Sequence, residues 1–443
     1  MDFLISNIGL LPLVLLLFWV VRGIKIPIAI VASMLLAYFF PLALFSVKGI
    51  SIQIMSVIIL FLYTYINRAK VKILQGHVQK VYWSLVVCSF VLYLLNLLFC
   101  SEIQFKVIGT VMTVLTSISS FVIAYSCVTF ATEKKELDFL SSVVAVIAAV
   151  ASIYSICCYY IGVNPFGIFL QSLFDYAEDY SEDMRGTLSG RVQGFQTHPL
   201  HFAGSILCAL FVVHMSFVKS ETILKKVVFG FFIVLLFVTL FYTGCRSGIV
   251  ACFCGFGLFY TIQSGRKSLF YLVILISLVY ILGIDQYVDM GKSSLLYSVT
   301  HFWEQNDEIS GSSLDMRINQ LVGTRDLVFT DVQTALWGKG TNWCNAYVTK
   351  FGHHPILEGF ESILFKWPIE LGILGFALLF YIMFVKPYTI VRSMPLGIEK
   401  KLLCCFLLSF SIFTVMTGCY ALDLFVVSVA LLIRYCNMNS LKC

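Results

Sequence analysis

The sequence predicts an all-α, polytopic membrane protein with about 12–13 transmembrane helices and two large extracytoplasmic loops. Composition is the first reason: 59% of the 443 residues are hydrophobic and only 12% are charged. A soluble domain cannot bury that much apolar surface. The second reason is periodicity, because apolar runs of roughly 17–25 residues, each long enough to cross a ~30 Å hydrocarbon core as a helix, recur along the whole chain.

Thirteen such runs can be recognised. They occupy residues 6–21, 26–46, 49–66, 82–100, 105–132, 138–163, 199–218, 226–244, 247–264, 268–284, 362–385, 402–418 and 420–435. Only a tight turn at 417–421 separates the last two, so they could also form one broken segment. The first run has neither a basic start nor a small-residue cleavage site, and we expect it to be a retained helix and not a signal peptide.

Basic residues predict the orientation, because they collect in cytoplasmic loops. If the first helix runs from outside to inside, 19 of the 30 lysines and arginines lie in cytoplasmic loops or the C-terminus. Most of the others lie in the two longest outside loops, which count least. We therefore expect the N-terminus outside and the C-terminus inside.

The chain divides into five parts along its length. N-terminal helices (1–163) are followed by a first extracytoplasmic loop (164–198), central helices (199–284), a large extracytoplasmic loop (285–361) and C-terminal helices (362–443). In the large loop, apolar residues at helical spacing predict an amphipathic helix over about 314–330, formed around Ile318, Leu321, Val322 and Phe329. A shorter interfacial helix is expected around Leu295, Val299 and Phe302.

Several classes of site have no support in the sequence. Most of the 15 cysteines lie inside apolar runs, where cysteine behaves as a small apolar residue. No paired CxxC motifs predict zinc, and nothing resembles a nucleotide-binding loop. The basic cytoplasmic loops suit anionic lipid better than nucleic acid. We therefore predict no metal, no cofactor and no nucleic-acid partner.

Five arginines fall on the predicted outer side: Arg185 and Arg191 close the first loop, Arg246 ends a helix, and Arg317 and Arg325 lie on the amphipathic helix. An arginine at a membrane edge is costly unless it is paired or lines a wet cavity. Its rigid fork of five donors also suits phosphate oxygens. The alternative is that each arginine snorkels to the surface or pairs with a carboxylate.

Three motifs accompany these arginines. GRVQGFQTHPLHFAG (190–204) leads from a loop into a helix, FYTGCRSG (241–248) ends another helix, and an arginine-bearing helix precedes LWGKG (336–340) and IELGILG (369–375). Together they resemble the superfamily of O-antigen polymerases and O-antigen ligases. FYTGCRSG is similar to that family's Thr-Gly-Ser-Arg turn, with cysteine in place of serine. The resemblance extends over roughly residues 185–385, whereas the first 180 residues match only as a stack of helices.

The resemblance implies a glycosyltransferase acting on the outer face of the bacterial cytoplasmic membrane. Undecaprenyl pyrophosphate carries an oligosaccharide, which moves to an acceptor hydroxyl as the lipid pyrophosphate leaves. Arg191, Arg246 and Arg317 would hold the pyrophosphate, with Arg325 as a further member, since fixed cationic donors stabilise the departing charge without a cofactor. The implied partners are the lipid-linked donor and acceptor, the bilayer and a chain-length regulator.

A group that accepts the acceptor's proton is also required. FGHHPILEGFESILFKW (351–367) offers His353, His354 and Glu361 just before the helix at 362–385. The two histidines could instead be a solvated loop pair, and Glu361 could simply complement the helix dipole. Ligases of the superfamily commonly begin this helix with a histidine about nine residues before the position of Glu370. Glu361 stands there, which favours a polymerase.

Three further residues receive predictions. His198 and Trp337 could contact the glycan, although His198 could merely cap the following helix and Trp337 could be an interfacial aromatic. Asp423, in the last hairpin, is expected at a membrane surface.

Two other functions stay open. A ligase would transfer the finished glycan to lipid A core. A transporter or flippase of lipid-linked glycan would show inverted repeats and broken helices with charges at the midplane, neither of which is evident in the sequence.

Overall fold

A computed structural model of the protein describes residues 10–47, 50–68, 76–102, 107–173, 191–264, 314–352, 354–355, 357, 362–394, 396–418 and 420–440. This part of the chain is helical apart from the two-residue strands β1 (Ser46–Val47) and β2 (Ile50–Ser51), which pair antiparallel. The predicted all-α class is confirmed for it. The apolar run 268–284, the helix around 295–302 and parts of both predicted loops lie outside the described residues.

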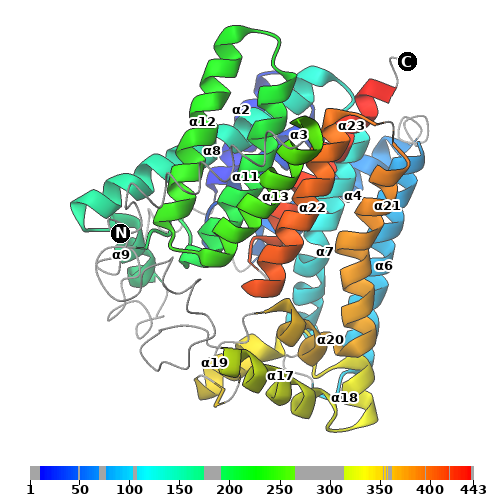
Figure 1. Ribbon diagram of the computed structural model, residues 1–443. Coiled ribbons are helices and arrows are strands. Elements are labelled where there is room, and N and C mark those ends of the chain that lie inside the picture. The colour runs from blue at the N-terminus through cyan, green and yellow to red at the C-terminus, as the bar shows by residue number, and fades with distance from the viewer. Residues whose placement is uncertain are drawn as a thin grey trace.

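The helices follow one another in a bundle (Figure 1). They are α2 (Leu11–Val21), α3 (Ile26–Ala37), η1 (Leu42–Leu44), α4 (Ile52–Ile66), α6 (His77–Phe99), α7 (Val107–Phe130), α8 (Lys134–Ile161), α9 (Pro165–Leu173), α11 (Pro199–Lys219), α12 (Ile223–Tyr242), α13 (Arg246–Ser264), α17 (Leu314–Val328), α18 (Val332–Trp337), α19 (Trp343–Phe351), α20 (Ile363–Phe380), η2 (Tyr381–Val385), α21 (Lys386–Arg392), α22 (Ile398–Met416) and α23 (Leu422–Ser440).

Five of the described helical segments are long and apolar enough to cross a membrane, judged by length and composition. They are His77–Phe99, Lys134–Ile161, Pro199–Lys219, Ile223–Tyr242 and Ile363–Arg392. Apolar side chains on the outer face of α12, such as Val227 and Phe231, are more than half exposed, at 63% and 61%. Faces of this kind suit contact with lipid. The chain therefore has the character of a polytopic membrane protein.

Helix α11 lies at the centre of the bundle and packs against α8, α12, α22 and α23. Its residues from Phe202 to Met215 are almost completely buried. The sequence permits this because α11 is apolar all round and carries small residues where its neighbours come close. At Gly204, for example, a Cβ would lie 2.9 Å from the Phe413 ring and 3.0 Å from Ala421.

The predicted run 26–46 is not one helix, which corrects the sequence analysis. Helix α3 ends at Ala37, and tighter turns follow in which Phe39 and Phe40 donate to the carbonyls of Leu36 and Ala37. Pro41 has no N–H and disfavours helical backbone in the residue before it, so the helix cannot continue. The chain instead turns through η1 and the small β-hairpin.

The last two apolar runs form two helices, so a turn and not one straight segment joins α22 to α23. In this turn, Gly418 and Ala421 both have positive φ angles, of 141° and 56°. Ser247, in the first turn of α13, makes a hydrogen bond with Thr417. The turn is thereby held at the N-terminal end of α13.

Helices α17, α18 and α19 form a small layer below the bundle in Figure 1, together with the lower part of α20. The predicted helix at 314–330 is observed as α17. Ile318 and Leu321 are 50% and 60% exposed, whereas Gln320 is buried and its Nε2 donates to the Leu357 carbonyl at 3.4 Å. Val328 is buried with Leu357 and Ile369, so a polar and an apolar contact together attach the helix to the layer.

Helix α20 is broken at Gly372, where φ is 69° and ψ is −179°. The backbone of LWGKG crosses the break: Lys339 N donates to the Ile369 carbonyl at 2.8 Å, and Gly340 N donates to the Glu370 carbonyl at 3.0 Å. These two carbonyls would otherwise lack partners near the kink. The crossing therefore satisfies the backbone groups that the break releases.

Asn96, near the end of α6, completes this crossing. Its Nδ2 donates to the carbonyls of Trp337 and Glu370, at 2.6 Å and 2.9 Å. Its Oδ1 accepts from the backbone N–H and the hydroxyl of Thr341, at 3.0 Å and 2.7 Å. One buried amide thus joins α6, LWGKG and α20.

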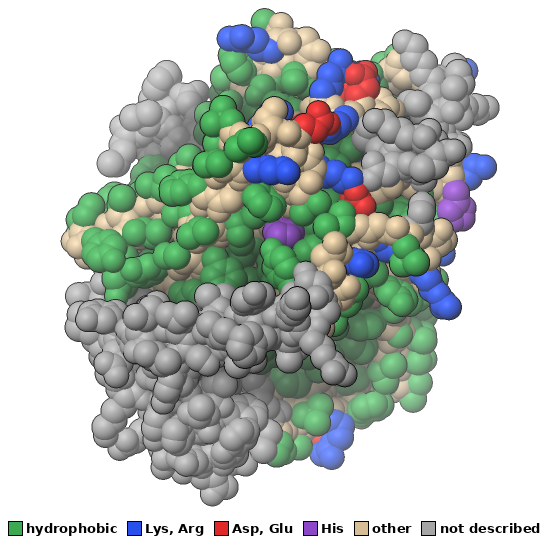
Figure 2. Space-filling model, turned by 45° about the horizontal axis from the view of Figure 1, so that its top comes forward, with side chains coloured by type: hydrophobic (Ala, Val, Ile, Leu, Met, Phe, Trp, Pro, Cys, Tyr) green, Lys and Arg blue, Asp and Glu red, His purple; other side chains and the backbone are tan. Residues whose placement is uncertain are grey.

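Charged residues gather at the opposite end of the bundle, around the α11–α12 connection (Figure 2). Lys25 pairs with Glu136 at 2.7 Å, and Lys219 forms an ion pair with Glu399. The molecule therefore has one charged end and one end that carries the α17–α19 layer.

The crossing leaves no room for a side chain at Gly338, where φ is 76° and an added Cβ would lie 2.5 Å from the Glu370 carbonyl carbon. We expect Gly338→Ala to prevent stable folding or to destabilise the protein by more than about 4 kcal/mol. Gly352→Ala is the matched control, because Gly352 has the same φ of 76° but nothing within 4 Å. The control should lose only the about 1–3 kcal/mol of backbone strain. Thermal melting of the detergent-purified variants measures both, and equal losses would contradict the close crossing.

Candidate functional site

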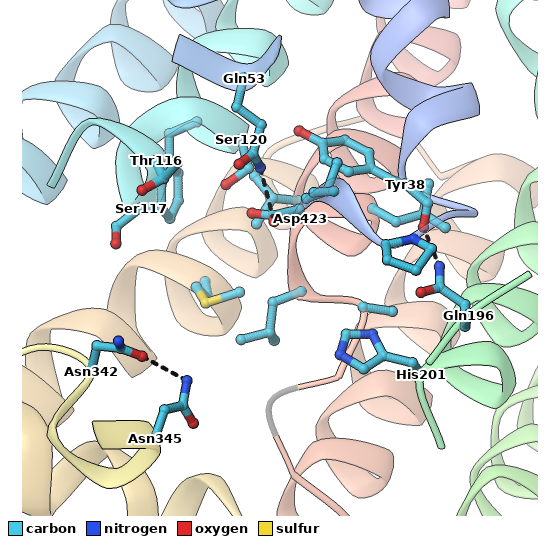
Figure 3. A pocket seen from close by; sticks show the side chains of 18 of the residues that line it. Tyr38, Gln53, Thr116, Ser117, Ser120, Gln196, His201, Asn342, Asn345 and Asp423 are labelled. Atoms are coloured by element: carbon cyan, nitrogen blue, oxygen red, sulfur yellow. Dashed lines mark hydrogen bonds between the residues drawn. The ribbon is translucent and has the colours of Figure 1, made fainter. Parts of the chain in front are cut away.

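A polar cavity of about 590 Å³ lies between the bundle and the α19–α20 layer (Figure 3). It is lined by Tyr38, Phe40, Pro41, Leu42, Gln53, Tyr93, Thr116, Ser117, Ser120, Phe121, Gln196, Thr197, His201, Asn342, Asn345, Trp367, Leu379, Met383, Ala421, Leu422, Asp423, Leu424 and Val426. A smaller cavity of about 180 Å³ adjoins it and shares Tyr93, Ser117, Asn342 and Trp367. The larger volume is within the usual range of ligand sites.

The cavity forms where helices are interrupted. Residues 38–42 follow the end of α3, residues 196–201 precede and begin α11, and residues 421–424 follow the α22–α23 turn. Gln196 fixes two of these segments to each other, because its Nε2 donates to the Tyr38 carbonyl at 2.7 Å. Irregular backbone at membrane depth is tolerated where it is buried in protein or lines a cavity. The break at Pro41 therefore contributes directly to the site.

Asp423 lines this cavity, although the sequence suggested only a position at a membrane surface. Its Oδ2 accepts a hydrogen bond from Gln53 Nε2 at 3.4 Å. Gln53 and Ser120 beside it are buried, at 5% and 3% exposure. Sequence reasoning missed Gln53 because a single glutamine in an apolar run carries no motif.

Arg191 and Arg246 come together at the junction of α12 and α13. Arg191 Nη2 donates to the Gly244 carbonyl at 2.9 Å, and the Arg191 side chain lies so close to Gly244 that a Cβ there would be 2.9 Å from it. Arg246 is the first residue of α13 and is half-buried. Two segments distant in sequence thus place the Arg191 guanidinium at the junction where Arg246 begins α13. Neither arginine belongs to the cavity wall described above.

The junction is connected to the cavity through the α22–α23 turn. Ser247 contacts Thr417 at one end of this turn, and Ala421 at its other end lines the cavity. Tyr420 lies between them and stacks on the His198 ring, with centroids 5.7 Å apart. The arginine junction and the cavity are therefore parts of one region.

His198 is the N-cap of α11, and its Nδ1 accepts from Leu200 N at 3.2 Å. The alternative that His198 caps the helix is thus observed, and its proposed contact with glycan stays a prediction. His201, three residues further on, lines the cavity and meets the Tyr420 ring edge-on at 4.9 Å. The helical spacing of the two histidines was the signal that could have indicated His201.

Trp337 and Arg325 lie in the small layer that contains α17, α18 and α19. Trp337 ends α18 and stacks on Phe99, with ring centroids 5.3 Å apart. Arg325 is exposed, and its Nε and Nη2 both donate to Asp326 Oδ1, at 2.9 Å and 2.8 Å. Neither residue lines the cavity. Arg317 is on α17, but its side chain, like His353 and Glu361, is outside the described part of the chain.

His354 lies beside Tyr347, and its Nδ1 accepts from Leu357 N at 3.1 Å. Partial burial lowers the pKa of His354 below its ordinary value, because burial disfavours the charged imidazolium. His354 is therefore a neutral imidazole near pH 7. Its role as a base stays a prediction.

Lys366 is a cation that sequence reasoning overlooked inside an apolar run. Its Nζ donates to Asn345 Oδ1 at 3.0 Å, and Asn345 Nδ2 in turn donates to Asn342 Oδ1 at 2.6 Å. Both asparagines line the cavity. Lys366 therefore places a positive charge beside the part of the cavity wall formed by Asn342 and Asn345. Figure 3 shows that these two asparagines lie on the side of the cavity away from Asp423.

Within the described residues, no three His, Cys, Asp or Glu side chains come together as a metal site. No protein-family model and no curated protein matches the sequence. The site is therefore characterised by its own geometry.

The Arg191–Gly244 contact leads to a stability prediction. Arg191→Met should destabilise the protein by about 1–2 kcal/mol, because the Gly244 carbonyl loses a charged donor at the end of α12. Arg325→Met should change stability by less than about 1 kcal/mol, because Arg325 is exposed and pairs only along the surface. Denaturation of the two purified variants under identical conditions compares them. A loss in Arg325→Met as large as in Arg191→Met would contradict an anchoring role for Arg191.

Proposed function

We propose that this chain is a membrane polysaccharide polymerase of the O-antigen or capsular type. It transfers glycan from an undecaprenyl-pyrophosphate-linked donor to a lipid-linked repeat-unit acceptor on the outer face of the bacterial cytoplasmic membrane. The observation that carries the proposal is the contact of Arg191 with Gly244, two residues before Arg246, at a helix start whose Ser247 bonds the turn that borders the polar cavity. This contact supports the shared role that the motif resemblance implies for the two arginines.

The junction suits a pyrophosphate. Backbone N–H groups and the helix dipole favour an anion at the start of α13, and the guanidinium groups add charged donors. In the proposed reaction the acceptor hydroxyl loses its proton and attacks the anomeric carbon, while the bond from that carbon to the pyrophosphate breaks. Arg246 and Arg191 stabilise the leaving anion, with Arg317 and Arg325 as further candidates, and Glu361, His353 or His354 takes the proton. No cofactor takes part.

The proposal includes 12–13 membrane-spanning helices with the N-terminus outside and the C-terminus inside. Two features support this orientation. Ion-paired lysines gather at the end that carries the α11–α12 connection, as expected for a cytoplasmic face, and the α17–α19 layer lies at the other end. The cavity would then be reached from outside.

A ligase that transfers glycan to lipid A core remains the nearest alternative, since the same site could serve it. A transporter of lipid-linked glycan is favoured by one specific observation. Helix α20 is broken at Gly372 inside an apolar segment, beside the buried Glu370, which the sequence analysis did not predict. The two classes differ in outcome, because a transporter moves the glycan across the bilayer and leaves its length unchanged.

The purified protein, incubated with lipid-linked repeat units alone, should give a ladder of lengthened glycans on gel electrophoresis. Arg246→Ala should slow the ladder by about 100-fold or more, the usual effect of removing a preorganised donor. Arg246→Lys should restore little of it, because an ammonium cannot reproduce a bidentate fork. Arg392→Lys, at the opposite end of the bundle, is the matched control.

Unchanged repeat units that cross the bilayer of a proteoliposome would instead support the transporter. Product that forms only after lipid A core is added would support the ligase. A fully active Arg246→Lys variant would refute the arginine clamp.

The orientation has its own test. Cysteine introduced at Lys350, on α19, should react with a membrane-impermeant thiol reagent added to intact cells. Cysteine at Glu221, an exposed residue in the α11–α12 connection, should react only after the cells are opened. The native thiols must first be shown to be silent. The reverse labelling pattern would place the cavity on the cytoplasmic side and refute the proposed orientation.

A further inference from the structure

One end of the cavity contains a group of polar side chains for which the reaction outlined above has no use. We call Tyr38, Gln53, Ser120 and Asp423 the polar recess. They come from the end of α3, from α4, from α7 and from the start of α23, and they meet in Figure 3. Three of them are almost completely buried, with Tyr38 and Gln53 both 5% exposed and Ser120 3% exposed. Four separate elements thus direct polar atoms to one place inside an apolar bundle.

Asp423 supplies the charge of the polar recess. Within the described residues it takes part in no ion pair, and its hydrogen-bond partners are Gln53, at 3.4 Å, and the Ser120 side chain. An ionised carboxylate offers about four acceptor positions, so about half of them are left over. Asp423 is only half-buried, and it lines the cavity, so these positions are open to a ligand there.

Tyr38 supplies the second, independent observation. Its hydroxyl is buried beside Gln53, but it makes no hydrogen bond within 3.5 Å to any described residue. An unpaired buried hydroxyl is destabilising by about 1–3 kcal/mol. The phenol lies on the side of the cavity that holds Gln53 and Asp423 (Figure 3). A ligand in the cavity would remove this penalty by bonding to the hydroxyl.

The chemistry of the cavity identifies the class of ligand. A carboxylate, an amide and two hydroxyls offer both acceptors and donors, which is what the hydroxyl groups of a sugar ring require. The rings of Tyr93 and Trp367 also line the cavity and can cover an apolar sugar face. Among the described residues of the wall, Asp423 is the one carboxylate, and the groups around it are an amide and hydroxyls.

We propose that the polar recess is a carbohydrate subsite, in which Asp423 and Tyr38 hydrogen-bond the ring hydroxyls of the acceptor's terminal sugar. The assignment to the acceptor rests on the proposed polymerase function. The donor pyrophosphate is expected at the arginine junction, so the carboxylate end of the cavity is left to the acceptor's terminal sugar, which is uncharged although the acceptor's lipid end carries a pyrophosphate. Asp423 would repel either pyrophosphate and accept from a sugar hydroxyl.

The test uses the full-length protein and the repeat-unit oligosaccharide, released from the host's lipid-linked pool by mild acid so that it carries no phosphate. Titration calorimetry measures binding, and thermal melting without ligand measures stability. Tyr38→Phe should melt at or above the wild-type temperature, because it removes an unpaired buried hydroxyl, yet bind the oligosaccharide roughly 5- to 10-fold more weakly. Asp423→Asn should weaken binding by about 10-fold or more.

Each variant has a matched control. Tyr82 is also buried with an unpaired hydroxyl, but it does not line the cavity, so Tyr82→Phe should share the stability effect and leave binding unchanged. Asp326 is an exposed aspartate on α17, and Asp326→Asn should bind like the wild type. If Tyr38→Phe and Asp423→Asn both bind like their controls, the subsite is refuted. It is also refuted if the wild type binds no oligosaccharide.

This result is separable from the test of the polymerase. Oligosaccharide binding that depends on the polar recess, in a protein that forms no ladder, would support the subsite and refute the polymerase. A ladder whose acceptor KM is unchanged in Tyr38→Phe and Asp423→Asn would support the polymerase and refute the subsite.

Discussion

The close backbone crossing between LWGKG and the break in α20 is the constraint on which the half of the structure that carries α17–α19 depends. A helix that breaks in an apolar environment releases carbonyl groups that neither lipid nor apolar side chains can satisfy. Lys339 N, Gly340 N and the Asn96 amide satisfy those of Ile369 and Glu370. The backbone of the LWGKG loop and the backbone of α20 approach so closely that each needs a glycine, Gly338 in the loop and Gly372 in the helix, because a Cβ at either position would overlap the other backbone. The break and the loop therefore stabilise each other.

The crossing also determines where the cavity lies. Thr341, which bonds to Asn96, leads directly into α19, and Asn342 and Asn345 of that helix form one wall. The opposite wall depends on two further interruptions, the end of α3 at Pro41 and the α22–α23 turn. Polar side chains from these interrupted segments, such as Gln196 and Asn342, line the cavity together with Gln53 and Ser120 from regular helices. The broken helices therefore contribute part of the cavity's polar wall.

Charge is separated around the cavity. Arg191 contacts Gly244 just before Arg246 begins α13, and Lys366 reaches Asn345, whereas Asp423 lies at the other end of the cavity. A site that binds a pyrophosphate and a neutral sugar needs this separation, because an anion is disfavoured beside a carboxylate and an unpaired carboxylate accepts hydroxyl donors well. The same separation would serve a transporter of a charged glycan less directly, since transport has no leaving group to stabilise.

The sequence by itself determined the helical class, because apolar runs long enough to cross a bilayer can bury their backbone polar groups only as helices. It also singled out Arg191 and Arg246 as candidate site residues, through glycine- and arginine-bearing motifs at helix ends, and their role stays a prediction. It could not show that 26–46 breaks at Ala37, that α17 packs by Gln320 and leaves Ile318 exposed, or that Asp423 faces a cavity with Tyr38 and Gln53. Those features depend on contacts between residues far apart in the chain, such as the 370 positions between Gln53 and Asp423. A local sequence pattern indicates only which secondary structure a segment prefers by itself. Tertiary packing decides which face of that segment contacts protein, lipid or a cavity.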